Sequence, residues 1–202
     1  MNGLDYWNKG ITYLEYKEKI ISLLSEGKVS GDVQNEDLQN YTRLNLHRME
    51  RVEKTFTPIH ETRFLIENEL PVTNWLVISE GWCGDAAQIL PVLYKLSELS
   101  KGKIAMRIVF RDENKELIDQ FLTNGGRSVP KLLGIQEGNL KFTWGPRPVV
   151  AQNLIQEIKT HTPANPKAYV EELHKWYAKD KGQEIQRELL ELVSANFGIK
   201  IS

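Results

Sequence analysis

Residues 75–86 of this 202-residue chain read WLVISEGWCGDA, and this stretch decides the predicted fold. The apolar run from Trp75 to Ser79 is rich in β-forming side chains, which is typical of a buried parallel strand. The only cysteine of the chain, Cys83, follows this run directly and precedes an apolar helical pattern that comprises Ile89, Leu90, Val92, Leu93, Leu96 and Leu99. We therefore expect a strand, a tight turn that carries Cys83, and a helix.

The segments that follow alternate between strand and helix patterns. Asn124, Gly125 and Gly126 stop the second helix, because glycine readily leaves the helical conformation. The expected elements are a strand over 104–110, a helix over 114–122, a hairpin of strands over 131–135 and 140–144, and a helix over 149–160. This order predicts an α/β core over residues 71–162.

Helical patterns flank this core on both sides. Before it, they cover residues 13–24, 36–56 and 61–69, and Pro58 separates the second from the third. After it, residues 165–197 predict two amphipathic helices that part near Gly182. We expect residues 1–70 to form an N-terminal helical extension packed on the core, and residues 163–202 to form a C-terminal helical extension.

Composition narrows the classes of function. The net charge is −1, so nothing draws the chain toward nucleic acid or an anionic membrane surface. The N-terminus has no secretory leader pattern, no apolar run is long enough to span a bilayer, and a single cysteine excludes an internal disulfide. The four histidines show no metal-ligand spacing. We expect a cytoplasmic protein without a metal site or a cofactor. The sequence carries no signal for an oligomeric state.

Cys83 is the candidate reactive group. A cysteine at the start of a helix lies close to unpaired backbone N–H groups and to the positive end of the helix dipole, which lower the pKa of the thiol. Asp85, in the first turn, should oppose this effect if its carboxylate points toward the sulfur. The simpler alternative is that Cys83 is a small buried apolar residue, the common fate of free cysteine.

Four landmarks in register resemble the thioredoxin superfamily over residues 73–160. Trp82-Cys83-Gly84 matches the start of the Trp-Cys-Gly-Pro-Cys motif, and Pro91 corresponds to the proline that kinks the active-site helix. Val129-Pro130 matches the cis-proline dipeptide, and Gly138 the hairpin glycine. Within the superfamily, the chain is similar to a thioredoxin-like family found in bacteria. The resemblance implies an α/β thioredoxin fold, a central mixed sheet flanked by helices, with helical extensions at both ends.

Two departures from the superfamily pattern decide the expected mechanism. Ala86 stands where the motif has its second cysteine, and Val77 stands where thioredoxins have a buried acid that assists that cysteine. A mixed disulfide at Cys83 would therefore have to be cleared by an external thiol. The resemblance thus implies monothiol chemistry rather than reduction of disulfides by a dithiol.

The residues around the motif form the expected substrate site. With a cis bond before Pro130, the backbone of Val129 is free to pair with an extended peptide or with a thiol ligand. Arg127 either lies near the sulfur, where it would lower the thiol pKa or hold a carboxylate, or pairs with Asp112 across two loops. The expected binding residues are Trp82, Gly84, Asp85, Arg127, Val129 and Pro130.

These residues lead to one preferred function and two alternatives. In the preferred one, Cys83 exchanges with the disulfide of a low-molecular-weight thiol or of a protein, and an external thiol regenerates it. In the first alternative, the protein is a non-catalytic binding module with the same fold. In the second, it is a redox sensor whose cysteine is oxidised to sulfenic acid.

Overall fold

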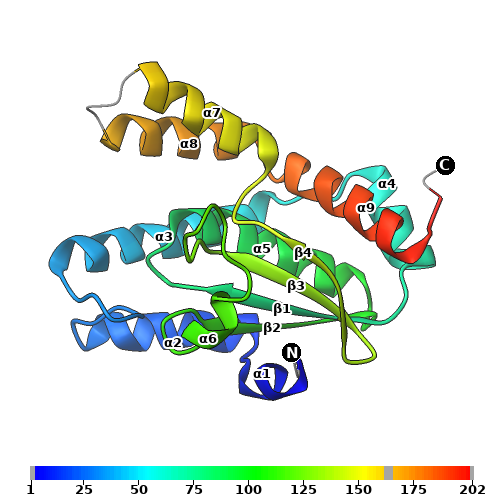
Figure 1. Cartoon of the computed structure of the whole chain (residues 1–202). Coiled ribbons are helices and arrows are strands. Elements are labelled where there is room, and N and C mark those ends of the chain that lie inside the picture. Colours follow the sequence, from blue (N-terminus) through cyan, green and yellow to red (C-terminus); the bar gives the residue numbers. More distant parts are fainter. Residues whose placement is uncertain (1–2, 162–165, 201–202) are drawn as a thin grey trace.

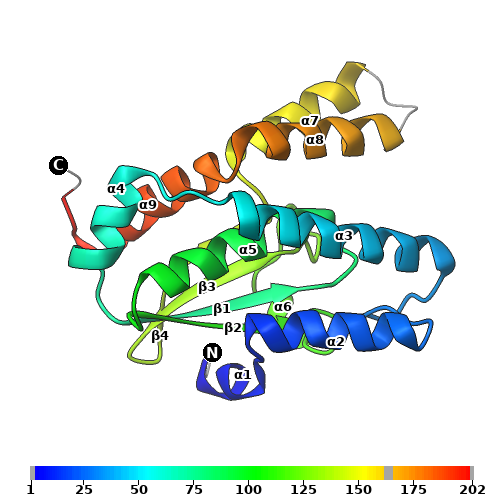
Figure 2. The same ribbon diagram turned by 180° about the vertical axis from the view of Figure 1, so that it is seen from behind.

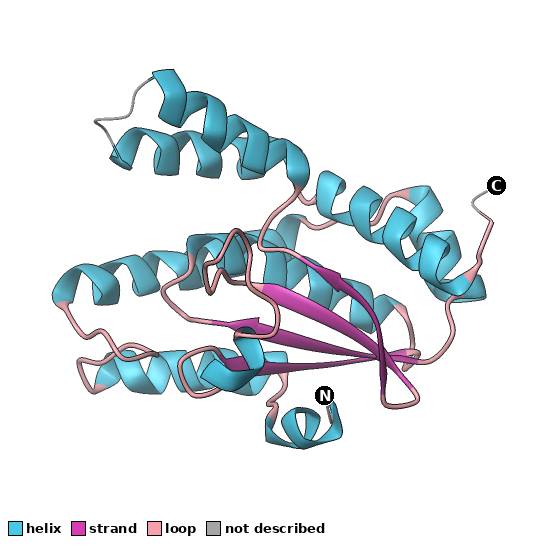
Figure 3. Ribbon diagram, in the orientation of Figure 1, coloured by secondary structure: helices cyan, strands magenta, loops and turns pink. Residues whose placement is uncertain are grey.

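The computed structural model describes residues 3–161 and 166–200. Its centre is a four-stranded sheet in the order β2-β1-β3-β4, drawn in magenta in Figure 3. The strands are β1 (Thr73–Ser79), β2 (Ile104–Phe110), β3 (Lys131–Gln136) and β4 (Asn139–Trp144). β1 runs parallel to β2 and antiparallel to β3, and β3 and β4 form a hairpin. This mixed sheet with its helices is the predicted α/β thioredoxin fold.

The helix that follows Cys83 lies on one face of the sheet. This helix, α5 (Gly84–Leu99), contains Pro91 and runs beside α3 (Glu36–Thr55), as both views show (Figures 1 and 2). Leu90 and Leu93 of α5 are completely buried. The packing of these residues fixes the position of α5, and with it the position of Cys83 at the N-terminus of the helix.

The helix predicted over residues 114–122 is shorter than expected. α6 covers only Lys115–Ile118, and the backbone N–H groups of Gln120 and Phe121 bond three residues back, as in a turn. Thr123 and Gly126 then form a two-residue bridge, with Gly125 at a φ of +77°. The prediction that the glycine pair ends the helix is therefore wrong, because the helix ends at Ile118 and the two glycines lie in a separate turn.

The N-terminal part contains one helix that the sequence did not predict, α1 (Gly3–Lys9). The next, α2 (Tyr13–Ser25), begins with a capping box: Glu15 N–H donates to the Thr12 hydroxyl, and the Glu15 carboxylate accepts from Thr12 N–H. The segment predicted as one helix over 61–69 consists of α4 (His60–Phe64) and a π-helical turn, η1 (Leu65–Glu69).

Three helices complete the chain: α7 (Val149–His161), α8 (Pro166–Asp180) and α9 (Gln183–Phe197). α7 and α8 form a hairpin beyond one end of the sheet, whereas α9 lies beside β4 and α4 (Figure 1). Gly182 separates α8 from α9 with a φ of +78°. Within the described residues, no helix has the length and apolar character needed to cross a membrane.

The flanking helices share the hydrophobic core of the sheet. Tyr16 and Met49, from before the sheet, and Tyr177 and Leu189, from after it, belong to the same buried cluster as the residues of β1 and α5. The flanks therefore build part of the core, and they also position side chains at the end of the sheet where Cys83 lies.

Candidate functional site

Cys83 is the N-cap residue of α5, directly after the turn that follows β1. The N–H of Ala86 donates to its sulfur, with 3.4 Å between the two atoms. The thiol itself donates to the carbonyl oxygen of Val129, 3.1 Å from Sγ. The peptide bond between Val129 and Pro130 is cis. The carbonyl expected to be free for a ligand thus accepts a hydrogen bond from Cys83 instead.

The expectation of a lowered Cys83 pKa is wrong for this geometry. Burial and, as the second cause, the charge of the Asp85 carboxylate raise the pKa of the thiol to about 12. The Ala86 N–H and the Arg147 guanidinium favour the thiolate, but they do not offset the loss of hydration. Only 7% of the Cys83 surface is exposed, and this loss of water outweighs the helix N-terminus. Cys83 is therefore a neutral hydrogen-bond donor at rest.

Asp85 forms a buried cluster with two residues that the sequence did not single out. Its Oδ2 accepts from Arg147 Nη2 at 2.6 Å, and its Oδ1 accepts from the Tyr177 hydroxyl at 2.7 Å. Burial raises the pKa of the Asp85 carboxyl, although Arg147 and Tyr177 favour its charged form. The Arg147 Nε is buried without a hydrogen-bond partner among the described residues. This cluster joins α5, α8 and the loop after β4.

A groove of about 880 Å³ opens above Cys83. We call it the Cys83 groove. Its lining comes from α3 (Leu38, Tyr41, Leu44, Arg48), from α8 (Tyr169, Val170, Glu171) and from the loops at the end of the sheet (residues 82–85, Arg111, residues 127–129, Pro146, Arg147). Of the expected binding residues, Trp82, Gly84, Asp85, Arg127 and Val129 line it, whereas Pro130 is buried next to Val129. The helical extensions form two of its walls.

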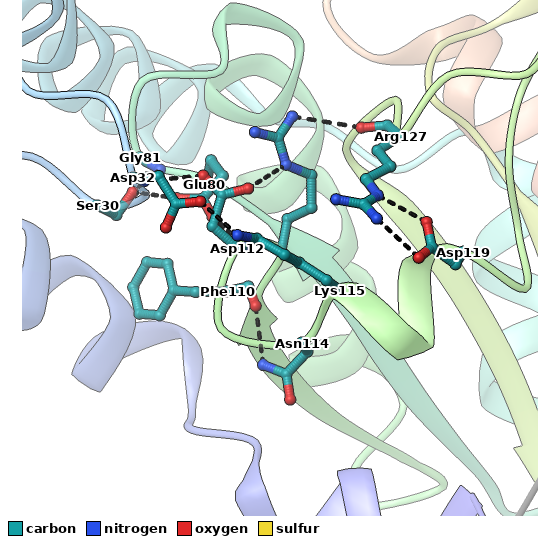
Figure 4. Close-up of polar contacts among 11 residues, drawn as sticks. Ser30, Asp32, Glu80, Gly81, Phe110, Asp112, Asn114, Lys115, Asp119 and Arg127 are labelled. Atoms are coloured by element: carbon teal, nitrogen blue, oxygen red, sulfur yellow. Dashed lines mark hydrogen bonds and ion pairs between the residues drawn. The ribbon is translucent and has the colours of Figure 1, made fainter.

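Arg127 lines the groove, but it does not pair with Asp112 and is absent from the causes of the Cys83 pKa. Its guanidinium forms a two-bond ion pair with Asp119, at 2.6 and 2.7 Å, and Figure 4 shows it turned toward that carboxylate. Asp112 pairs instead with Arg111, whose Nε lies 2.7 Å from Oδ1. Arg111 Nη1 also donates to the Arg127 carbonyl, and the Arg111 guanidinium lies 4.8 Å from the centre of the Trp82 ring. Arg111 therefore links the two loops in place of Arg127.

A second buried carboxylate, that of Glu80, takes part in the hydrogen bonds that hold the turn before Cys83. It accepts from the Ser30 hydroxyl and from the Asp112 N–H at 2.9 Å, and the Gly81 N–H donates to Ser30 Oγ at 2.9 Å (Figure 4). Glu80 is completely buried, which raises the pKa of its carboxyl. These bonds tie the loop after α2 to the turn, so the N-terminal extension helps to hold Cys83 in place.

Three groove residues, Tyr41, Arg48 and Arg147, escaped the sequence analysis, and so did His174, which bonds to Tyr41. Tyr41 and Arg48 lie in the helical segment over 36–56, and His174 lies in a C-terminal helix, and neither segment carries a motif. No spacing rule places them beside Cys83, because only the packing of α3 and α8 does so. Among the described residues, no group of three or more histidine, cysteine, aspartate or glutamate side chains is arranged to hold a metal ion.

Comparison with known proteins agrees with this architecture. The sequence model of a thioredoxin family matches residues 31–159. The chain belongs to this thioredoxin family. The match includes α3, one wall of the Cys83 groove, and stops within α7. The other helical wall, α8, therefore lies outside the part that the family model describes.

Two solved structures resemble the whole chain. One is PA1234, a protein of unknown function from Pseudomonas aeruginosa, with 19% identity and a TM-score of 0.56 over 87% of this chain and 90% of that one. The other is an HIV epitope-scaffold, with 14% identity and a TM-score of 0.51 over 94% of this chain and 97% of the scaffold. At these identities the likeness concerns the fold alone. It includes the helical extensions, because it covers most of both chains.

Proposed function

We propose that the protein is a thioredoxin-fold binding protein that holds a low-molecular-weight thiol, or its disulfide, in the Cys83 groove. The observation that carries this proposal is the state of Cys83: it lines the groove, yet its thiol is bonded to Val129 and its pKa is raised to about 12. A thiol in this state is suited to contacting a ligand and poorly suited to attacking one.

The walls of the groove favour a small ligand over a protein. α3 and α8 flank the approach to Cys83, so a ligand has to enter between two helices. Four arginines line the groove, Arg48, Arg111, Arg127 and Arg147, against the two carboxylates of Asp85 and Glu171. Arg111, Arg127 and Arg147 already pair with Asp112, Asp119 and Asp85, so among the described residues Arg48 is the groove arginine whose charge is left to complement a thiol that carries carboxylates. The single cysteine fits a reducing compartment, so we propose the cytoplasm as the location.

Monothiol exchange is the second candidate. It is favoured by the position of Cys83 at the N-cap of the 16-residue helix α5, where Ala86 N–H already contacts the sulfur. In this reaction the Cys83 thiolate attacks one sulfur of a disulfide, the S–S bond breaks, and the other sulfur leaves as a thiolate. A second external thiolate then attacks the mixed disulfide and releases Cys83, because the chain has no other cysteine.

The raised pKa disfavours both exchange and sensing. A rise from 9 to about 12 lowers the thiolate population about a thousandfold at neutral pH, and the greater nucleophilicity of a basic thiolate recovers only about twenty- to thirtyfold. Oxidation to sulfenic acid also starts from the thiolate, so a redox sensor meets the same obstacle. Binding without a covalent step does not need the thiolate and does not meet this obstacle.

Titration with glutathione and with glutathione disulfide tests the proposal. Backbone NMR shifts report binding, intact mass reports an adduct, and Cys83→Ser serves as the matched variant without a thiol. Saturable shifts around Trp82 and Val129 in both proteins, without an adduct, support the binding protein. An adduct on the wild type that forms faster than on N-acetylcysteine, and that external thiol removes, overturns it in favour of monothiol exchange. The absence of both shifts and adduct refutes both candidates.

A further inference from the structure

A chain of polar side chains crosses three helices beside the Cys83 groove. Arg51 Nη2 lies 3.1 Å from Gln88 Oε1, and Gln88 Nε2 lies 3.1 Å from His174 Nδ1. His174 Nε2 lies 2.9 Å from the Tyr41 hydroxyl. α3 supplies Arg51 and Tyr41, α5 supplies Gln88, and α8 supplies His174. This series of hydrogen-bonded side chains ends at Tyr41, which lines the groove.

The direction of every hydrogen bond in this chain follows from its first member. A guanidinium can only donate, so the oxygen of Gln88 faces Arg51 and the amide nitrogen faces His174. That nitrogen donates to His174 Nδ1, which leaves the ring proton on Nε2. His174 Nε2 then donates to the Tyr41 oxygen. The Tyr41 hydroxyl proton therefore needs another acceptor, and no hydrogen bond within the described residues provides one.

A neutral imidazole is what this arrangement requires. Burial and the nearby Arg48 and Arg51 lower the pKa of His174 to about 4, so the ring carries a single proton at neutral pH. The two ring nitrogens then have different roles, one accepting and one donating. The orientation of the Tyr41 hydroxyl is thus set from outside the groove by residues that do not need to touch a ligand.

The Tyr41 hydroxyl lies directly over the residue next to Cys83. A Cβ atom added to Gly84 would come within 2.5 Å of the Tyr41 oxygen. Arg48, which follows Tyr41 on the same face of α3, places its guanidinium 4.9 Å from the centre of the Tyr41 ring. Arg48 donates to the Asn45 side chain at 2.8 Å, but it forms no ion pair with a carboxylate in the part of the chain that the structure describes.

We propose that Tyr41 and Arg48 form an anion subsite that holds a carboxylate of the ligand beside Cys83. The Tyr41 O–H donates to one oxygen, and the Arg48 guanidinium supplies the charge. His174, Gln88 and Arg51 are positioning residues that aim the Tyr41 hydroxyl. This inference rests on the proposed function, because it names the chemical group by which the Cys83 groove recognises its small ligand.

Alkylation of Cys83 by two reagents of the same reactivity class tests the subsite. Iodoacetate carries a carboxylate and iodoacetamide does not, and the one cysteine thiolate of the protein attacks the CH2 carbon of either reagent and displaces iodide. The ratio of their rates therefore cancels the thiolate population. We expect the iodoacetate-to-iodoacetamide ratio of the protein to exceed that of N-acetylcysteine by about tenfold or more, since hydrogen bonds to charged groups are among the stronger ones.

Variants assign the effect to the two residues. Tyr41→Phe and Arg48→Gln should each lower the ratio about tenfold, and any change in the thiolate population cancels in that ratio. Arg43→Gln is the matched control, because Arg43 also lies on α3 but is exposed and, within the described residues, bonds to Asn40. A wild-type ratio equal to that of N-acetylcysteine, or a raised ratio that both variants leave unchanged, overturns the subsite.

Two further readouts complete the test. Nitrogen NMR of His174 should show the proton on Nε2, and Gln88→Leu should both perturb that tautomer and lower the ratio. A proton on Nδ1 overturns the role of the polar chain. Acetate should compete with iodoacetate better than inorganic phosphate does, and the reverse result replaces the carboxylate by a phosphate.

The subsite and the proposed function can fail separately. If glutathione binds but the iodoacetate-to-iodoacetamide ratio equals that of N-acetylcysteine, the subsite fails and the proposed function stands. If glutathione does not bind but the ratio is raised, the proposed function fails.

Discussion

Replacing Asp85 by asparagine is expected to make Cys83 more reactive. The asparagine amide would keep an oxygen that can accept from the Tyr177 hydroxyl, so the change removes mainly the negative charge. That charge is the second-largest cause of the raised Cys83 pKa, after burial. Its loss also leaves Arg147 without its ion-pair partner, close to the sulfur. Both consequences favour the thiolate.

The magnitude follows from the cost of neighbouring like charges. A nearby charge shifts a pKa by about 1 to 3 units, so the Cys83 pKa should fall from about 12 to between about 9 and 11. For each unit, the thiolate population rises about tenfold and its nucleophilicity falls about threefold. The rate of alkylation by iodoacetamide at pH 8 should therefore rise about 3- to 30-fold. The pH dependence of this rate, followed by intact mass, gives the pKa directly.

Asp119→Asn is the matched control for this prediction. It removes a carboxylate that pairs with Arg127, another arginine of the groove, but it lies on the exposed surface and is absent from the causes of the Cys83 pKa. Its alkylation rate should stay within about twofold of the wild type. Breaking a buried ion pair also costs stability, about 3 to 5 kcal/mol as an upper range, so the fold of Asp85→Asn must first be verified by circular dichroism. A folded Asp85→Asn protein whose thiol pKa stays near 12 would refute the electrostatic account of the site.

Three further predictions concern stability. The pKa of His174 is about 4 in the folded state against 6.5 in the free residue, so the folded state binds fewer protons than the unfolded state between these pH values. The free energy of unfolding should therefore fall by at most about 3 kcal/mol as the pH drops from 6.5 to 4, and by less where solvent screens the ring. In urea unfolding, His174→Asn should show a shallower pH dependence than the wild type. Gly134→Ala would bring a Cβ within 2.3 Å of the Phe142 ring, so it should cost about 1 to 3 kcal/mol in urea unfolding, whereas Gly126→Ala, whose nearest neighbour is 3.5 Å away, should change stability by less than about 0.5 kcal/mol. Gly84→Ala should cost a similar 1 to 3 kcal/mol by displacing Tyr41 and His174, and an unchanged melting temperature would contradict the close packing of these two side chains over Gly84.

The fold was largely predictable because its signals are local. The strand over 75–79, the helix after Cys83 and the hairpin around Gly138 each follow from periodicity and turn residues, and the structure confirms them with shifts of a few residues at their ends. The structure differs from the predicted elements in three places, one of which is the added helix α1. The other two have physical causes. Residues 119–122 form turns because the chain must reach the Thr123–Gly126 bridge, and η1 widens to a π-helical turn in the short helical segment before β1. Neither constraint leaves a trace in sequence periodicity.

The site was predictable only where it belongs to the motif. Cys83, Gly84 and Val129 come together because strand ends and helix starts meet at one end of such a sheet, and the sequence places them there. The partner of Arg127 was not predictable, since Asp112 and Asp119 both precede it in the chain and only the turn after α6 brings Asp119 to its guanidinium. The pKa of Cys83 was predicted in the wrong direction, because the sequence reveals the helix dipole but not the burial that α3 and α8 impose.

The burial of Cys83 that raises its thiol pKa also bears on the proposed anion subsite. The burial of the sulfur disfavours the Cys83 thiolate, and a ligand that displaces water from the groove would strengthen each hydrogen bond or ion pair that it forms there. Asp85 neutralises Arg147 at the buried end, whereas Arg48 has no described carboxylate partner at the end near Tyr41. The groove therefore carries its unbalanced positive charge on the α3 side. A ligand whose carboxylate lies against α3 would place the rest of its body toward Cys83 and Val129, where an acceptor could compete for the thiol hydrogen that Val129 now receives. On this view the helical extensions, more than the cysteine motif, determine what the protein binds.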